Sequence, residues 1–138
     1  MENPQENKQA LIYQFRYLKE QRDMFVNQIE IVNASLNNLM NTKATTENLK
    51  NVKEGEEILV PIGGLINIHA TIKDPKKILL YISQDIVIEK DLDSSIEFID
   101  KVIGQHNEQL HFLRTQIGQH DEQLQKMSYA FQRSGFQP

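Results

Sequence analysis

The chain has 138 residues, the size of one domain, and a formal net charge of −4 at pH 7. This charge gives no support for nucleic-acid binding, which favours a basic face, and the absence of cysteine excludes disulfides and cysteine-based metal or redox chemistry. With 39% hydrophobic residues, no tryptophan and a mean hydropathy of −0.51, the composition suits an elongated coiled coil better than a compact globule.

The first predicted element is a long helix over residues 5–51. Pro4 with acidic neighbours is typical of a helix start, and Gly55 suits the stop beyond its end. Two rows repeat every seven residues and form a narrow coiled-coil stripe, which only Arg22 interrupts. The first row is Leu11, Leu18, Phe25, Val32 and Leu39, and the second is Phe15, Arg22, Ile29 and Leu36.

Residues 57–90 are rich in Ile, Leu and Val and are broken by Gly, Pro, Asp and Ser, which is typical of short strands joined by tight turns. We expect four strands, over 57–62, 65–73, 77–82 and 86–89, paired as two successive hairpins. Gly63-Gly64 suits the first tight turn, and Ser83-Gln84-Asp85 closes the second hairpin. Hairpins this short are marginally stable alone and have unpaired edges, so they need partner strands.

The second predicted helix covers residues 92–133, with Asp91 or Asp93 as its cap. Its two rows are Ile96, Ile103, Leu110, Ile117, Leu124 and Phe131, and Ile99, His106, Leu113, His120 and Met127. A near-duplication, IGQHNEQL at 103–110 and IGQHDEQL at 117–124, is offset by two heptads, as a repeating coiled coil requires.

The two helices are expected to pair antiparallel. In one register every layer of the two stripes is filled, with Leu11 facing Phe131, Phe25 facing Ile117, and the interior Arg22 facing His120. The predicted fold is therefore α+β: a long antiparallel coiled-coil hairpin with two β-hairpins between its helices, as a single domain over residues 1–138.

Four segments carry a resemblance to a known family: Leu59-Val60-Pro61-Ile62-Gly63, Ile72-Lys73-Asp74, Val87-Ile88-Glu89-Lys90-Asp91-Leu92 and Ile96-Glu97-Phe98-Ile99. Together with the flanking heptads, they resemble the prefoldin α subunit of the archaeal type over nearly the whole chain. Two hairpins rather than one point to the α class. The family often has a Gly-Ala-Gly type second turn, and here that turn is Ser83-Gln84-Asp85.

The resemblance implies a heterohexamer of two α and four β subunits whose hairpins form an oligomeric β-barrel. It implies an ATP-independent chaperone that holds non-native client proteins at its coiled-coil tips and passes them to a group II chaperonin. The alternative is a structural coiled-coil scaffold or adaptor subunit without client binding.

No arrangement of residues suits catalysis, so no enzyme activity and no cofactor are expected. His106 and His120 are 14 residues apart, roughly 21 Å along a helix, so they cannot share a metal ion. No stretch approaches the roughly 20 apolar residues of a membrane span. The polar start, MENPQENKQ, lacks the apolar run of a signal peptide, and a cytoplasmic location is expected.

Two groups of residues are expected to make contacts with other chains. Strand residues with open edges beside them form a predicted oligomer interface: Ile58, Val60, Ile66, Ile68, Ile86 and Ile88. Apolar residues at the free helix ends form the predicted client-binding surface: Leu11, Ile12, Tyr13, Phe15, Tyr17, Met127, Tyr129, Phe131 and Phe136. Single exposed apolar residues are normal on proteins, and it is the family resemblance that favours a clamp for unfolded chains.

Overall fold

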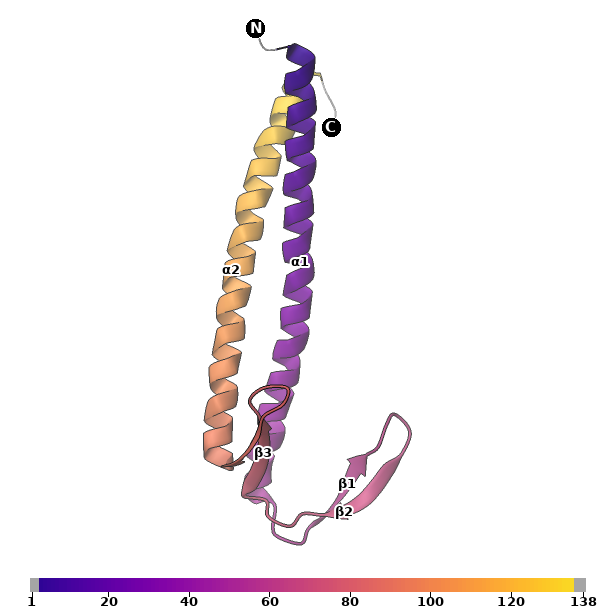
Figure 1. Cartoon of the computed structure of the whole chain (residues 1–138), viewed down its shortest axis with the longest axis vertical. Helices are drawn as coiled ribbons and strands as arrows, with labels where there is room; N and C mark the ends of the chain where they lie inside the picture. The colour runs from indigo at the N-terminus through magenta and orange to yellow at the C-terminus, as the bar shows by residue number, and fades with distance from the viewer. Residues whose placement is uncertain (1–2, 136–138) are drawn as a thin grey trace. The chain divides into compact units, whose positions relative to one another are not determined.

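The computed structural model describes residues 3–135 and consists of two long helices with two β-hairpins between them (Figure 1). The predicted fold class is confirmed. The elements in chain order are α1 (Pro4–Asn48), the 3-10 turn η1 (Leu49–Asn51), β1 (Glu57–Pro61), β2 (Asn67–Thr71), β3 (Lys77–Tyr81), β4 (Val87–Asp91) and α2 (Leu92–Arg133). The chain divides into two compact units: a helical unit, which runs up to Leu36 and resumes at Gln105, and a hairpin unit, Asn37–Gly104.

Helix α1 continues through a segment of poor helix propensity, residues 41–46. Thr42 Oγ1 donates a hydrogen bond to the Asn38 carbonyl at 2.9 Å, and Thr46 Oγ1 donates to the Thr42 carbonyl at 2.7 Å. Lys43 pairs with Asp100 of α2 at 2.7 Å. Because these contacts tie the segment to its own preceding turn and to α2, tertiary packing outweighs the weak propensity of the threonines.

Helix α2 begins directly after β4, without a loop, because Asp91 serves both elements. Its Oδ1 accepts the backbone N–H of Ser94 at 2.7 Å and its Oδ2 accepts the Ser94 hydroxyl at 3.1 Å. Asp91 is therefore the N-cap of α2, and it supplies negative charge at the positive end of the helix. Asp93, the other predicted cap, instead pairs with Lys50 at 3.1 Å.

The core of the helical unit lies between α1 and α2 on the predicted stripes. Val32, Leu110 and Leu113 are buried there, and half-buried stripe residues of α1 surround them: Phe25, Ile29 and Leu36. The apolar side chains that α1 and α2 bury follow the heptad rows, so the antiparallel pairing of the two helices is hydrophobic in origin.

The core cluster agrees with the predicted register, because it contains the expected pair Val32 and Leu110, and Ile29 packs against the same cluster as its expected partner Leu113. Phe131 packs its ring on Phe15, with centroids 5.7 Å apart, one turn along α1 from its expected partner Leu11. Arg22 Nε donates to Asp121 Oδ1 at 2.8 Å, beside the expected partner His120, which packs edge-on against Phe25. A long arginine side chain can extend from a core row to the helix edge, where a carboxylate can neutralise the guanidinium.

The strands form two separate two-stranded antiparallel sheets. Glu57 pairs with Thr71 at the open end of the first, and Lys77 pairs with Asp91 at the open end of the second. Gly63 has φ +105°, a conformation that favours glycine, in the turn of the first hairpin. The second turn closes without any positive-φ residue among those described, which explains why Ser83-Gln84-Asp85 can replace a glycine-rich turn.

We expect Leu113→Ala to destabilise the helical unit by about 2–5 kcal/mol, because Leu113 is only 2% exposed and its loss leaves a cavity. Phe112→Ala is the matched control, since the adjacent Phe112 is exposed, and it should change the free energy of unfolding by less than about 0.5 kcal/mol. Urea unfolding followed by circular dichroism measures both. Equal losses would contradict the assigned core.

The hydrogen bonds from Ser94 hold the pKa of the Asp91 carboxyl below its ordinary value. A lowered folded-state pKa means that the stabilising effect of the charged cap is complete above the unfolded-state pKa, about 3.9, and is lost as the pH falls through the lower folded value. Asp91→Asn keeps a capping oxygen but cannot ionise. We expect its Tm to lie below that of the wild type at pH 7, with a gap that narrows below about pH 4. A gap independent of pH would contradict the role of the charge.

Candidate interaction surfaces

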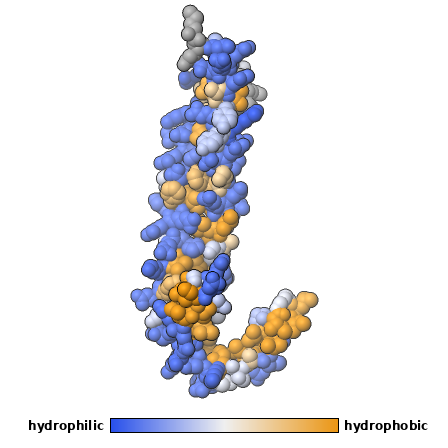
Figure 2. All heavy atoms as spheres, viewed as in Figure 1, coloured by the Kyte–Doolittle hydropathy of each residue, from blue (hydrophilic) through white to orange (hydrophobic). Residues whose placement is uncertain are grey.

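The two β-hairpins expose most of the apolar surface outside the helices (Figure 2). Leu65, in the first turn, is 98% exposed. Large apolar side chains are exposed on every strand or its adjoining turn: Leu59, Ile62, Leu65, Ile66, Ile68, Leu79, Tyr81, Ile82, Ile86 and Val87. Each strand also has one unpaired edge, since both sheets have only two strands. Apolar surface and open edges together are the features of a surface that pairs with other chains.

The six predicted interface residues lie on this surface. Ile58, Val60 and Ile88 are half-buried, whereas Ile66, Ile68 and Ile86 are exposed. Cross-strand pairs place Ile58 with Ala70, Val60 with Ile68 and Leu80 with Ile88, so one face of each hairpin is apolar.

Sequence reasoning missed the apolar residues on the opposite faces of the same hairpins. Leu59, Leu79 and Tyr81 alternate with the predicted residues and are exposed. The available signal was the unbroken run Ile78-Leu79-Leu80-Tyr81, because strands that are covered on both faces have continuous rather than alternating apolar residues.

The predicted client-binding residues fall into four groups. Leu11, Tyr13, Tyr17 and Tyr129 are exposed, with Tyr13 at 74%, whereas Ile12, Phe15 and Met127 are half-buried. Phe131 is only 4% exposed and packs on Phe15, so it holds the two helices together and offers little surface. Phe136 lies outside the described residues. The exposed part of the predicted surface is therefore formed by Leu11 and three tyrosines.

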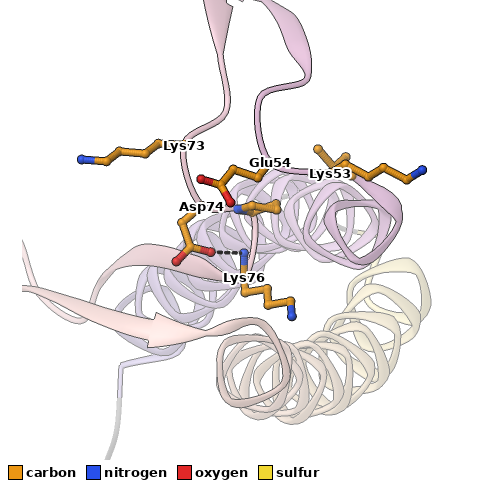
Figure 3. A pocket seen from close by; sticks show the side chains of 7 residues that line it. Lys53, Glu54, Lys73, Asp74 and Lys76 are labelled. Atoms are coloured by element: carbon orange, nitrogen blue, oxygen red, sulfur yellow. Dashed lines mark hydrogen bonds between the residues drawn. The ribbon is translucent and has the colours of Figure 1, made fainter.

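A pocket of about 560 Å³ lies between the segment before β1 and the β2–β3 connection (Figure 3). Asp74 Oδ1 accepts the backbone N–H of Lys76 at 3.0 Å, which stabilises the turn. The ammonium groups of Lys53, Lys73 and Lys76 point away from one another (Figure 3). Polar groups that do not converge make a poor ligand site, so we assign no binding function to this pocket.

The described residues contain no group of three His, Asp or Glu side chains placed to hold a metal ion. The two histidines on the stripe have structural partners: His106 Nε2 is 2.9 Å from Ser35 Oγ, and His120 Nδ1 is 2.7 Å from the Gln116 carbonyl. Neither helix, within residues 3–135, is long and apolar enough to cross a membrane.

Two long helices paired antiparallel, with paired hairpins between them, define a coiled-coil subunit of an assembly. Residues 18–135 match the family model described as Prefoldin subunit, so the chain belongs to the prefoldin family and the predicted resemblance is confirmed. The family consists of chaperones rather than enzymes, and the chain accordingly has the general role of a chaperone subunit.

Known relatives agree with this assignment. Prefoldin subunit alpha 1 of Thermococcus kodakarensis is 34% identical over 99 residues, which cover 71% of this chain and 67% of that protein. Prefoldin subunit alpha of Pyrococcus horikoshii is 28% identical over 109 residues, 77% of this chain and 74% of that protein. A filamentous PFD from Methanocaldococcus jannaschii, solved by cryo-EM, has the same fold, with a TM-score of 0.74 at 20% identity over 82% of this chain and 93% of that one.

We expect the paired substitutions Leu65→Ser and Leu79→Ser to abolish assembly while leaving the helix content unchanged, because both side chains are exposed on hairpins and support no core. Sedimentation velocity measures the assembly and circular dichroism the helix content. Tyr13→Ser, equally exposed but at the start of α1, is the control and should assemble normally. Normal assembly of the hairpin variant would show that these side chains are not at the interface.

Proposed function

We propose that this chain is the α subunit of an ATP-independent holding chaperone. In this proposal two such chains join four β subunits through their hairpins, the strands close a shared β-barrel, and the helix tips hold non-native clients before a group II chaperonin receives them. The assembly would work in the cytoplasm. The observation that carries the proposal is that both the hairpins and the helix tips expose large apolar side chains.

The hairpin surface supports the assembly step. Its strands have unpaired edges and apolar side chains on both faces, so a single chain cannot cover them. Strands of neighbouring subunits would satisfy the edges and bury both faces. A closed barrel removes edges altogether, which gives a physical reason for the predicted β-barrel.

The tip surface supports client holding. Tyr13, Tyr17 and Tyr129 each present an apolar ring with a polar hydroxyl, which suits contact with varied and partly hydrated chains. A single partly buried side chain contributes only about 1–2 kcal/mol. Useful holding therefore requires several subunits to contact one client, so that the second and later contacts benefit from a high effective concentration.

The test is the triple variant Tyr13→Ser, Tyr17→Ser, Tyr129→Ser in the assembled complex. Three lost contacts of about 1 kcal/mol each should weaken client holding by on the order of 100-fold. Light scattering of denatured citrate synthase on dilution, without nucleotide, measures the protection, and native mass spectrometry checks that the assembly is intact.

The matched control replaces three exposed glutamines of the same helix ends, Gln5, Gln9 and Gln132, by serine, and it should protect normally. Full protection by the tyrosine variant would show that clients bind elsewhere than at the helix tips. If the wild-type complex itself gave no protection, the scaffold alternative would replace the proposal. Handover is tested by adding a group II chaperonin, which should release the client from the complex.

A further inference from the structure

The antiparallel helices of the helical unit meet along two edges that differ in chemistry. On one edge Ser35 of α1 lies 2.9 Å from His106 of α2, and on the other Arg22 pairs with Asp121 at 2.8 Å. These two contacts fix which heptad rows of α1 and α2 lie on the same side. The α1 row that contains Ser35 and the solvent-facing row next to it therefore lie on the same side as the two α2 rows next to His106.

The side marked by Ser35 is almost without charge, and we call it the glutamine face. Fifteen residues form it, all exposed except the half-buried Gln21 and Gln116. They are Gln14, Tyr17, Gln21, Met24, Gln28, Ile31 and Ser35 of α1 with Gln105, Gln109, Phe112, Gln116, Gln119, Gln123, Lys126 and Ala130 of α2. Lys126 is the only charged member, and it pairs with Glu122 at 2.8 Å.

The side marked by Arg22 has the composition of an ordinary solvated surface. Six charged residues lie on it. They are Arg16, Lys19, Asp23 and Glu30 of α1 with Arg114 and Asp121 of α2. The same two helices therefore have one side with six charged residues and one side with a single charged residue, so the scarcity of charge on the glutamine face is not a property of the coiled coil as a whole.

Large apolar side chains lie exposed on the glutamine face. Tyr17, Met24 and Ile31 follow one another at intervals of seven residues along α1, about 10 Å apart, and Phe112 lies on α2. Ile31 is 70% exposed. Apolar side chains repeating on one solvent-facing row, on a face with a single charged residue, match the composition of binding surfaces rather than of free surface.

We propose that the glutamine face is a second client-binding surface, which holds extended non-native polypeptide along the helices beyond the tips. This inference rests on the proposed holding function. A folded partner of fixed sequence is recognised in part through complementary charge, which selects the right partner and repels wrong ones. The glutamine face offers almost no charge for such recognition. Its occupant is therefore a polypeptide whose own charge differs from one client to the next. Non-native clients have that property.

The side chains of the face suit such an occupant. A glutamine carboxamide both donates and accepts hydrogen bonds, so it can pair with the backbone N–H and C=O groups that every unfolded chain exposes. Met24 adapts its shape to different apolar side chains. The face also continues from the tip, since Tyr17 belongs to both surfaces.

Methionines 24 and 40 provide a matched test, because they are 53% and 54% exposed on the same helix. Sixteen residues separate them, which at 100° per residue turns them about 160° apart, so Met40 points away from the row of Met24. Each is replaced in turn by the photo-crosslinking residue p-benzoylphenylalanine in the full chain within its assembly. The probe is reduced, carboxymethylated α-lactalbumin, which stays unfolded.

We expect position 24 to crosslink to the probe at least about fivefold more than position 40, the ratio for a preference of about 1 kcal/mol. Equal yields, or crosslinks from position 24 only to another subunit of the assembly, would overturn the inference. A third variant, with the crosslinking residue at position 13 in the tip surface, distinguishes failure of this inference from failure of the proposed holding function. Crosslinks from position 13 but not 24 overturn the second surface alone, whereas none from any position, with no binding by the wild type, overturns both proposals.

Discussion

A two-stranded hairpin has two faces and two unpaired edges, and the two hairpins of this chain carry apolar side chains on both faces. Within residues 3–135, Leu65, Leu79 and Tyr81 are 98%, 71% and 70% exposed. Burial of apolar surface contributes roughly 25 cal/mol per Å², so leaving these residues in water has a real free-energy cost. The need for partner strands is the constraint from which the rest of the account follows: a subunit of this kind is completed by assembly.

The helices meet a different requirement, because they bury their apolar stripes against each other and still leave surface for other contacts. Val32, Leu110 and Leu113 form the core of this pairing, and Phe131 packs on Phe15 near the helix ends. The exposed tyrosines at the helix ends and the glutamine face lie outside this core. The proposed holding function requires such a division between surfaces for assembly and surfaces for transient partners.

Much of this architecture could be predicted from the sequence, because its physical causes are local and periodic. Heptad rows identified the buried residues of the helices, the glycine pair identified the first turn, and Asp91 was one of two predicted caps. The predicted pairs of Val32 with Leu110 and of Ile29 with Leu113 lie together in the core cluster. The partner of Arg22 was harder to predict, because its long side chain reaches Asp121, the neighbour of His120.

Three features could not be seen in one-dimensional patterns. The weak helix propensity of residues 41–46 is offset by hydroxyl bonds and by the pair between Lys43 and Asp100. Phe131 fitted both the buried stripe and the predicted client-binding surface, and only its contact with Phe15 decides between them. The glutamine face appears only when rows from both helices are assigned to one side, which requires knowing which edges meet.

Hydrogen exchange of the hairpin amides, read in the dissociated chain and in the assembled complex, tests the central constraint most directly. Unpartnered two-stranded hairpins open readily, so amides of residues 57–91 should exchange fast in the dissociated chain and become strongly protected on assembly. Amides around Leu113 should be protected equally in both states. Hairpin amides that are already protected in the dissociated chain, or that stay unprotected in the complex, would contradict the account.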